Sequence, residues 1–244
     1  MKVSLFVTCV VDQLYPQVGM AAVEVLTRLG VEVAFNREQT CCGQPAFNSG
    51  FRKEACDVAA HMLDVFESEL KSADYIVAPS GSCTTMVKKF YTELFEGDAE
   101  NLARASAVGG RLFEFSEFLV DVLGVGGVEA CFHGKVTYHD SCHLLRELGI
   151  SRQPRELIES VAGVEFVEMD RADVCCGFGG TFSVKYPEIS TAIAEEKIAG
   201  IERSGAGAVV ACDSSCLMQI AGLLARRGST VRCMHIAELL ASRT

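Results

Sequence analysis

Short apolar runs alternate with longer amphipathic stretches along the whole chain. The apolar runs are typical of strands buried on both faces, and the amphipathic stretches have the spacing of helices. The predicted strands are 2–8, 31–35, 75–78, 135–140, 164–169, 208–211 and 230–234. The predicted helices are 20–29, 52–71, 154–161, 187–204, 217–227 and 237–242. This alternation predicts an α/β fold with mainly parallel sheets that helices cover on both faces.

The order of elements occurs twice, and cysteines repeat with it. The matched cysteines, separated by 133 or 134 residues, are Cys9 and Cys142, Cys41 and Cys175, Cys42 and Cys176, and Cys83 and Cys216. This period is far too long for a solenoid. It predicts two similar Rossmann-like halves related by a pseudo-two-fold duplication. We place a first Cys-Cys-Gly domain at 1–127 and a second at 134–244, joined near the glycines at 124–127 and His133-Gly134.

Two pairs of cysteines are adjacent in the sequence, Cys41-Cys42 and Cys175-Cys176. Neighbouring Cα atoms lie ~3.8 Å apart, below the usual disulfide range of roughly 4.4–6.8 Å, so neither pair is a good disulfide. The chain has 12 cysteines in 244 residues, a high count for a cytosolic protein. In a reducing compartment that count indicates metal binding or catalysis.

The two Cys-Cys-Gly turns predict iron–sulfur chemistry. Adjacent thiolates can bind different iron atoms of one cluster, and a following glycine lets the backbone wrap closely around it. The turns fall at strand ends, where ligands bind in parallel α/β folds. The predicted cofactor-binding glycines are Gly43, Gly177, Gly179 and Gly180. The predicted metal ligands are Cys9, Cys41, Cys42, Cys83, Cys142, Cys175, Cys176, Cys212 and Cys216.

Cys212 is included as a fifth thiolate of the second half, since it is spaced Cys-x3-Cys from Cys216 and falls at a strand end. A buried strand cysteine is the alternative. For the whole set, the alternatives are buried structural cysteines and a zinc site in one or both halves. Neither half has, among its four shared cysteines, the Cys-x2–4-Cys knuckle that is usual for zinc.

Several further residues have simpler interpretations. Cys56 lies on the apolar face of a predicted helix, and Cys131 and Cys233 have no counterpart in the other half, so we expect all three to pack in the interior. His139 and His143 flank Cys142 and are either donors beside a metal centre, a proton relay or solvated loop histidines.

Charge and composition exclude some classes of function. The net charge is −10, and no Lys/Arg-rich run indicates nucleic-acid binding. The longest apolar runs are about half the ~20 residues that a membrane-spanning helix needs, and no cleavable leader is evident. We therefore expect a cytoplasmic protein without direct membrane insertion. The sequence shows no flavin or nicotinamide fingerprint and no Ser/His/Asp arrangement.

The cysteine motifs and their surroundings resemble those of the cysteine-rich Cys-Cys-Gly domain proteins, which include the cysteine-rich subunit of heterodisulfide reductase and glycolate oxidase iron–sulfur subunits. The blocks that carry the resemblance lie at 3–9, 41–50, 79–86, 141–143, 175–185, 216–218 and 235–240. They extend from one end of the chain to the other. One departure is that Pro79 stands near the position that corresponds to Cys212, so the first half offers only four cysteines.

The resemblance implies a [4Fe–4S]-type centre in an electron-transfer subunit. The members that this chain resembles most imply oxidation of L-lactate to pyruvate, with the other subunits of a lactate oxidation complex as partners. An oxidoreductase subunit that is not active alone is the leading interpretation. The alternatives are a thiol/disulfide reductase subunit that binds substrate directly at a non-cubane cluster, and a zinc-stabilised structural module.

Overall fold

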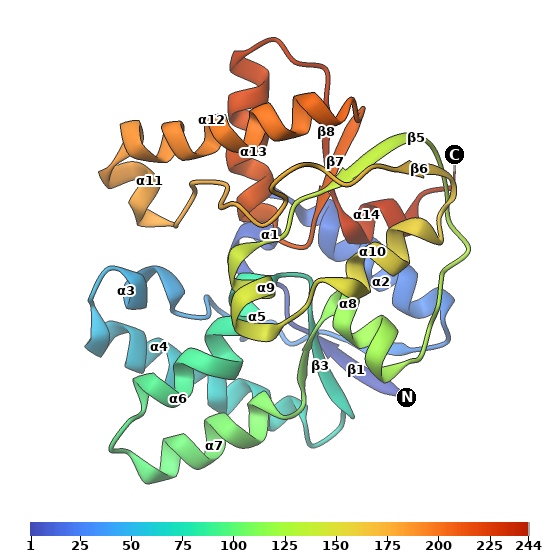
Figure 1. The fold of residues 1–244 in the computed structure, drawn as a ribbon. Coiled ribbons are helices and arrows are strands. Elements are labelled where there is room, and N and C mark those ends of the chain that lie inside the picture. Colours follow the sequence, from blue (N-terminus) through green and yellow to red (C-terminus); the bar gives the residue numbers. More distant parts are fainter. Residues whose placement is uncertain (244) are drawn as a thin grey trace.

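The computed structural model describes residues 1–243 and contains two four-stranded sheets whose neighbouring strands are all parallel (Figure 1). The strand order is β2-β1-β3-β4 in the first sheet and β6-β5-β7-β8 in the second. Both sheets have the order 2-1-3-4 when strands are counted within their own half. The predicted α/β class and the two similar parallel halves are confirmed.

The first half contains the elements β1 (Lys2–Leu5), α1 (Cys9–Leu14), α2 (Pro16–Arg28), β2 (Glu32–Ala34), α3 (Gln44–Asn48), α4 (Arg52–Glu69), β3 (Tyr75–Ala78), α5 (Gly81–Thr85), the π-helical turn η1 (Met86–Phe90), α6 (Tyr91–Leu94), α7 (Ala99–Gly109), β4 (Leu112–Glu114), α8 (Phe115–Glu117) and the π-helical turn η2 (Phe118–Val122).

The second half contains the elements β5 (Cys131–Tyr138), α9 (Cys142–Leu148), α10 (Arg152–Glu159), β6 (Ala162–Phe166), α11 (Thr181–Lys185), α12 (Pro187–Ser204), β7 (Ala208–Ala211), α13 (Ser214–Arg226), β8 (Arg232–His235) and α14 (Ile236–Ala241). Strand β5 begins at Cys131 and shifts its register to β6 between Cys131 and Gly134. Gly134, which the sequence placed near the join between the halves, therefore lies inside strand β5.

The predicted first strand is shorter than expected. It ends at Leu5, and a short helix begins at Cys9, so this cysteine lies at a helix start. The same arrangement follows β5, where α9 begins at Cys142. The first half also has α7, β4, α8 and η2, which the apolar pattern did not indicate and which correspond to the C-terminal elements of the second half.

The two halves exchange their last helices. Helix α14 of the second half packs against α2 of the first, and α8 and η2 of the first half pack against α10 of the second. One continuous apolar core therefore includes α2, η2, α10 and α14, with Leu26, Leu119, Leu157 and Leu240 among its buried members. Two further apolar clusters lie within single halves, one beneath α4 and one beneath α12 and α13. The halves form one folding unit because their largest core is shared.

We expect Ile236→Ala to destabilise the whole chain. Ile236 opens α14 and is fully buried in the shared core, and removing such a side chain costs about 2–5 kcal/mol. Chemical denaturation followed by circular dichroism should show one transition moved to lower denaturant. The exposed Leu102→Ala on α7 is the control and should change stability little. Two separate transitions, with only one affected, would contradict a shared core.

Candidate metal centre

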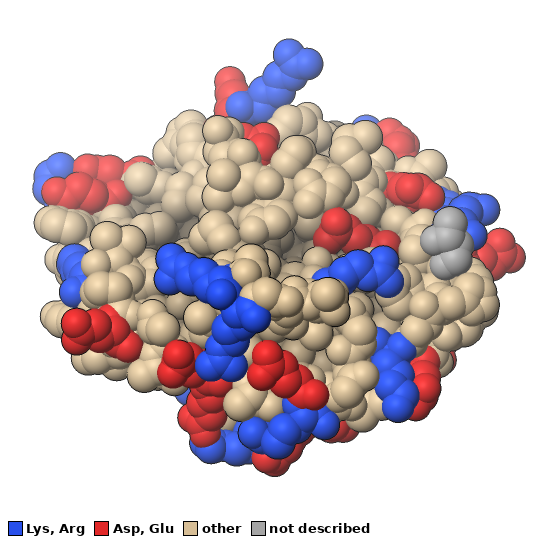
Figure 2. Space-filling model, turned by 90° about the horizontal axis from the view of Figure 1, so that it is seen from above, with Lys and Arg blue, Asp and Glu red and all other residues tan. Residues whose placement is uncertain are grey.

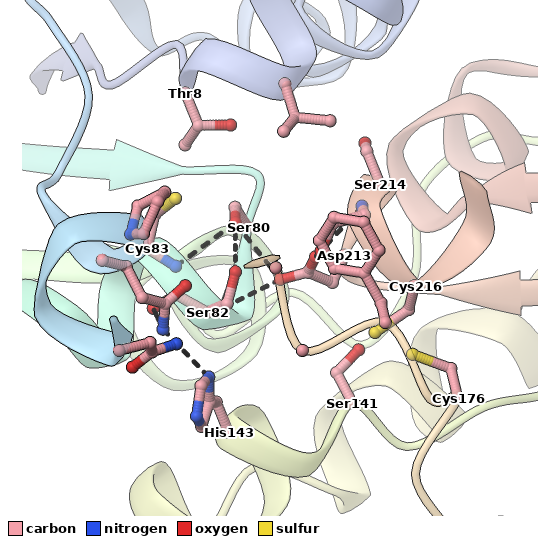
Figure 3. Close-up of a pocket in the computed structure, with 18 of the residues that line it drawn as sticks. Thr8, Ser80, Ser82, Cys83, Ser141, His143, Cys176, Asp213, Ser214 and Cys216 are labelled. Carbon is pink, nitrogen blue, oxygen red and sulfur yellow. Dashed lines mark hydrogen bonds between the residues drawn. The ribbon is translucent and has the colours of Figure 1, made fainter. Parts of the chain in front are cut away.

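Eight cysteines from both halves line one cavity of about 460 Å³ between the carboxyl ends of the two sheets. They are Cys9, Cys41, Cys42, Cys83, Cys142, Cys175, Cys176 and Cys216. Figure 3 shows Cys83 on one side of this cavity and Cys176 with Cys216 on the other. The sequence predicted two sets of four thiols, and the fold directs both sets into the same space.

The first set forms a chain of sulfur contacts. The sulfurs of Cys9 and Cys41 lie 3.8 Å apart. The thiol of Cys42 hydrogen-bonds to Cys41 and Cys83, and these bonds, together with burial, raise the pKa of Cys42. The same bonds have the opposite effect on their acceptor: hydrogen bonds from Cys42 and Cys9 lower the pKa of Cys41 to about 3. Cys41 is therefore the thiol of this set that ionises most readily.

The second set repeats this chain. Cys142 hydrogen-bonds to Cys175, and Cys176 hydrogen-bonds to both Cys175 and Cys216. Bonds from Cys142 and Cys176 lower the pKa of Cys175 to about 2, so Cys175 is the thiol of this set that ionises most readily. The order 142–175–176–216 matches the order 9–41–42–83 of the first set. The duplication therefore extends to the side chains.

Helix starts and glycine turns direct backbone N–H groups at the sulfurs. Cys9 and Cys142 are the first residues of α1 and α9. Gly43 N–H donates to the Cys41 sulfur at 3.4 Å, and Gly177 N–H donates to the Cys175 sulfur at 3.3 Å. Both glycines have positive φ, 86° and 84°, which other residues rarely adopt. Such donors stabilise an anionic ligand set.

The remaining predicted glycines belong to the wall of the cavity. Gly179 and Gly180 have φ of 56° and 64° and line the cavity just before α11. A Cβ on Gly179 would lie 2.9 Å from the Cβ of Phe182, so this turn is packed tightly. All four predicted glycines therefore shape the turns around the thiols. Their role as cofactor-binding residues stays a prediction.

Asp213 joins the two halves beside the thiols. Its Oδ2 accepts a hydrogen bond from the Ser82 N–H at 2.8 Å and one from the Ser80 hydroxyl at 3.3 Å. Its Oδ1 accepts from the N–H of Ser215 at 3.1 Å. Figure 3 shows this network between Cys83 and Cys216. The carboxylate therefore links the starts of α5 and α13, the two helices that carry these cysteines.

Cys212 lies apart from the other predicted ligands. It is fully buried in the shared core and does not line the cavity. Its sulfur accepts a hydrogen bond from the Tyr138 hydroxyl at 3.4 Å and lies 3.9 Å from the Ser116 hydroxyl. Cys212 is thus a buried cysteine at a strand end, which was the alternative interpretation. Its side chain lies in the core and outside the cavity that the second set lines.

Two buried basic residues lie near the second set: His139, whose role the sequence left open, and Lys197, which the sequence did not indicate. His139 is fully buried, so it is no solvated loop histidine, and burial lowers its pKa to about 3. Lys197 on α12 donates to the carbonyl oxygens of Arg171 and Ala172 at 2.8 and 2.9 Å, and burial lowers its pKa to about 8. A helical lysine seldom lies inside, and only the tertiary contacts show that this one does.

The remaining cysteines and His143, which the sequence analysis also considered, lie as follows. Cys56 and Cys233 pack against apolar clusters, as expected. Cys131 is partly exposed, with its sulfur 3.5 Å from Nε2 of His133. His143 lines the cavity, and its Nδ1 lies 3.1 Å from the side-chain nitrogen of Gln44 in the other half. This contact is a second polar link across the cavity.

The two thiol sets differ in how closely their candidate ligand atoms are gathered. In a tetrahedral zinc site of four thiolates with Zn–S bonds of ~2.3 Å, all sulfurs lie ~3.8 Å apart. Within residues 1–243, the one group of three or more candidate ligand atoms lying within 4.8 Å of one another is His139, Cys176 and Cys216. The first set is therefore too open for a zinc tetrahedron. Spread sulfurs suit a cluster that binds each thiolate through a different metal atom.

The surface agrees with the composition. Figure 2 shows a face on which basic and acidic side chains are interspersed around uncharged regions, with no extended basic patch. Among the described residues, the helices are all too short or too polar to cross a membrane.

Comparisons with known proteins bear on the whole chain. The family model described as a cysteine-rich domain matches twice, at residues 3–88 and 136–221. The chain is 49% identical over 243 residues to lactate utilization protein A of Geobacillus kaustophilus, with all of both chains covered. It is 46% identical to the protein of the same name in Bacillus subtilis, again with full coverage of both. One matched segment lies within each half of the fold.

The similarity to solved structures is weak. An aspartate racemase homologue from Pyrococcus horikoshii covers 98% of this chain and 95% of its own, with a TM-score of 0.36 and 10% identity. This value is too low to support an argument about fold or function.

We expect Gly177→Ala to destabilise the protein more than Gly43→Ala. A Cβ at Gly177 would lie 2.4 Å from the backbone oxygen of Ser190, whereas one at Gly43 would lie 3.4 Å from that of Ala55. Both variants lose about 1 kcal/mol or more to the positive φ, and only the first adds a backbone clash. Gly222→Ala, in α13 with open space around it, is the control and should be neutral or stabilising. Thermal melts compare the three, and equal losses at Gly43 and Gly177 would contradict the packing argument.

In metal-free, reduced protein we expect Cys41 and Cys175 to be alkylated first. Their lowered pKa values keep them ionised at pH 5, and the thiolate is the reactive form. Their rates should therefore change little between pH 5 and pH 8. Burial raises the pKa of Cys233 to about 12, so its rate should rise about tenfold per pH unit. Mass spectrometry after timed iodoacetamide treatment measures each site. A steep pH dependence at Cys41 and Cys175 would be evidence against the ionised thiols.

Proposed function

The chain belongs to the cysteine-rich domain family, and from this premise we propose that it is an iron–sulfur electron-transfer subunit of a multi-subunit oxidoreductase that serves lactate utilization. The observation that carries the proposal is the pair of matching four-thiol sets that line one cavity. When bound, a cluster of the [4Fe–4S] type takes up and releases single electrons. We place the protein in the cytoplasm.

The residues of the chain supply ligands and a shielded setting. The thiolates of Cys41 and Cys175 are held in anionic form by neighbouring thiols and by the N–H groups of Gly43 and Gly177. Cys42, Cys83, Cys176 and Cys216 are all buried. Burial and N–H···S hydrogen bonds are the means by which a protein adjusts the reduction potential of such a centre.

The proposal requires partner subunits. Oxidation of L-lactate to pyruvate releases electrons and protons, and that step needs a group that accepts hydride or its equivalent. The sequence contains no flavin or nicotinamide fingerprint. We therefore assign lactate oxidation to companion subunits of a lactate oxidation complex, and electron transfer between a donor and an acceptor to this chain. The relatives named lactate utilization protein A support this assignment.

A second candidate function is reduction of a small disulfide within the cavity. One observation favours it: thiols of both halves line a single space, so a bound molecule would contact both sets. The fifth thiolate that would strengthen it, Cys212, is directed into the core. Addition of a small disulfide to the dithionite-reduced protein tests this function, because reoxidation would be visible in the cluster absorbance. A disulfide that leaves the spectrum unchanged would exclude it.

We expect Cys176→Ser to remove the iron of the second half and Cys212→Ser to retain it. Cys176 contacts two thiols of the set, whereas Cys212 contacts Tyr138 and Ser116. The matched variant Cys42→Ser should remove the iron of the first half. Anaerobic iron and sulfide analysis, with EPR of the reduced protein, measures both effects.

Two outcomes would count against the proposal. Zinc without iron or sulfide in anaerobically purified protein would exclude an iron–sulfur centre and support a zinc-stabilised module. Equal losses of iron and EPR signal in Cys176→Ser and Cys212→Ser would instead make Cys212 a ligand, and would favour the reductase.

A further inference from the structure

His139 lies against the second thiol set without taking part in any interaction described so far. It directly follows strand β5, and its backbone N–H donates to the Val210 carbonyl oxygen at 2.9 Å. A nitrogen of its ring lies within 4.8 Å of the sulfurs of Cys176 and Cys216, which lie within 4.8 Å of each other. All three side chains are buried.

The imidazole of His139 lacks polar partners of its own. Within residues 1–243, neither ring nitrogen has a partner in good hydrogen-bonding geometry, although the side chain is completely buried. The carbonyl oxygen of Ala172 lies near the ring, but it already accepts from the Asp140 N–H at 3.1 Å and from the Lys197 ammonium at 2.9 Å. The nearest candidates along the chain are already engaged, since both carboxylate oxygens of Asp140 accept from Arg155 at 2.9 and 2.7 Å. Folded proteins leave few buried polar atoms unsatisfied, and each exception calls for an explanation, such as an ion.

The first half shows that the fold itself does not require a histidine here. His139 precedes Cys142 by three residues, as Phe6 precedes Cys9. Phe6 is fully buried and packs edge-to-face on Phe66, with ring centroids 5.1 Å apart. A hydrocarbon ring therefore fills the equivalent position, and the two nitrogens of His139 add nothing to packing. A neutral imidazole offers two things that phenylalanine lacks, an N–H donor and a lone pair that can bind a metal.

We propose that His139 supplies an imidazole nitrogen as the fifth donor to the metal centre of the second half. It thereby takes the role that the sequence suggested for Cys212. This inference rests on the proposed function for the presence of a centre and deepens it by making the two centres chemically different. The first would have four thiolates and the second four thiolates and a nitrogen, because Phe6 cannot bind metal.

Pulsed EPR on dithionite-reduced protein tests this, with protein grown on ¹⁵N-histidine compared with unlabelled protein. We expect a strong hyperfine coupling from a directly bound histidine nitrogen in the wild type. His139→Phe, which installs the residue of the first half, should lose that coupling while the EPR signal of the first centre remains. His235→Asn is the matched control: His235 is also fully buried with a free Nε2, lies outside the cavity lining, and its loss should leave the coupling intact.

The outcomes separate this inference from the proposed function. A normal reduced-cluster signal without strong nitrogen coupling, or with only the weak coupling of an N–H···S hydrogen bond, would overturn the role of His139 and leave the iron–sulfur centre standing. If zinc is found in place of iron, the labelled protein loaded with Co(II) gives the same test, and a missing coupling again overturns it. Protein that holds neither metal would overturn both. The wild-type comparison needs no variant, so it decides the matter even if His139→Phe fails to fold.

Discussion

The carboxyl ends of the two central strands β3 and β7 meet, and a small set of hydrogen bonds joins them. The Gly81 N–H donates to the Cys212 carbonyl oxygen at 3.1 Å, and the Asp213 carboxylate accepts from Ser80 and Ser82. Helices α5 and α13 begin at this junction and carry Cys83 and Cys216. A cluster site formed at the end of either sheet must therefore face the other. Side-chain clearance is small here, since a Cβ on Gly81 would lie 2.9 Å from that of Leu144.

The shared core keeps this junction in place. Because α14 packs on α2 and α10 packs on α8 and η2, neither half can turn relative to the other without exposing apolar surface of both. Burial of such surface contributes roughly 25 cal/mol per Å², so exposing a helix face is costly. The distance between the two thiol sets is thus determined by the interior of the whole chain. For a protein that transfers electrons, such a fixed separation is useful.

The two thiol sets are similar, and a few differences between the halves give them unlike surroundings. The first set borders hydrocarbon, with Phe6 and Leu63 fully buried nearby. At the corresponding positions the second half has His139 and Lys197. A buried ammonium group near the second set favours negative charge there, so a centre in the second half would accept an electron more readily than one in the first. Two similar sites in one cavity can in this way differ in their chemistry.

The sequence by itself determined the local chemistry of this protein. The spacing of 133 or 134 residues between matched cysteines revealed the duplication, and the apolar runs placed β3, β7 and α12 at their observed bounds. The Cys-Cys-Gly turns indicated a backbone that wraps closely around the sulfurs, and the N–H groups of Gly43 and Gly177 do donate to Cys41 and Cys175. These features depend on residues that are close together in the sequence, and the duplication repeats them in each half.

Only the tertiary structure decided how the halves combine. That both thiol sets line one cavity follows from helix exchange and from the Asp213 junction, which join residues more than 130 positions apart. Cys212 directly follows β7, and its side chain could point either to the cavity or to the core. In the structure it points into the core, where it contacts Tyr138 and Ser116. The sequence left open whether His139 was a solvated loop residue or a donor beside a metal centre, and the fold buries it completely. Burial and direction of a side chain result from contacts between distant segments, and periodicity along one segment does not contain them.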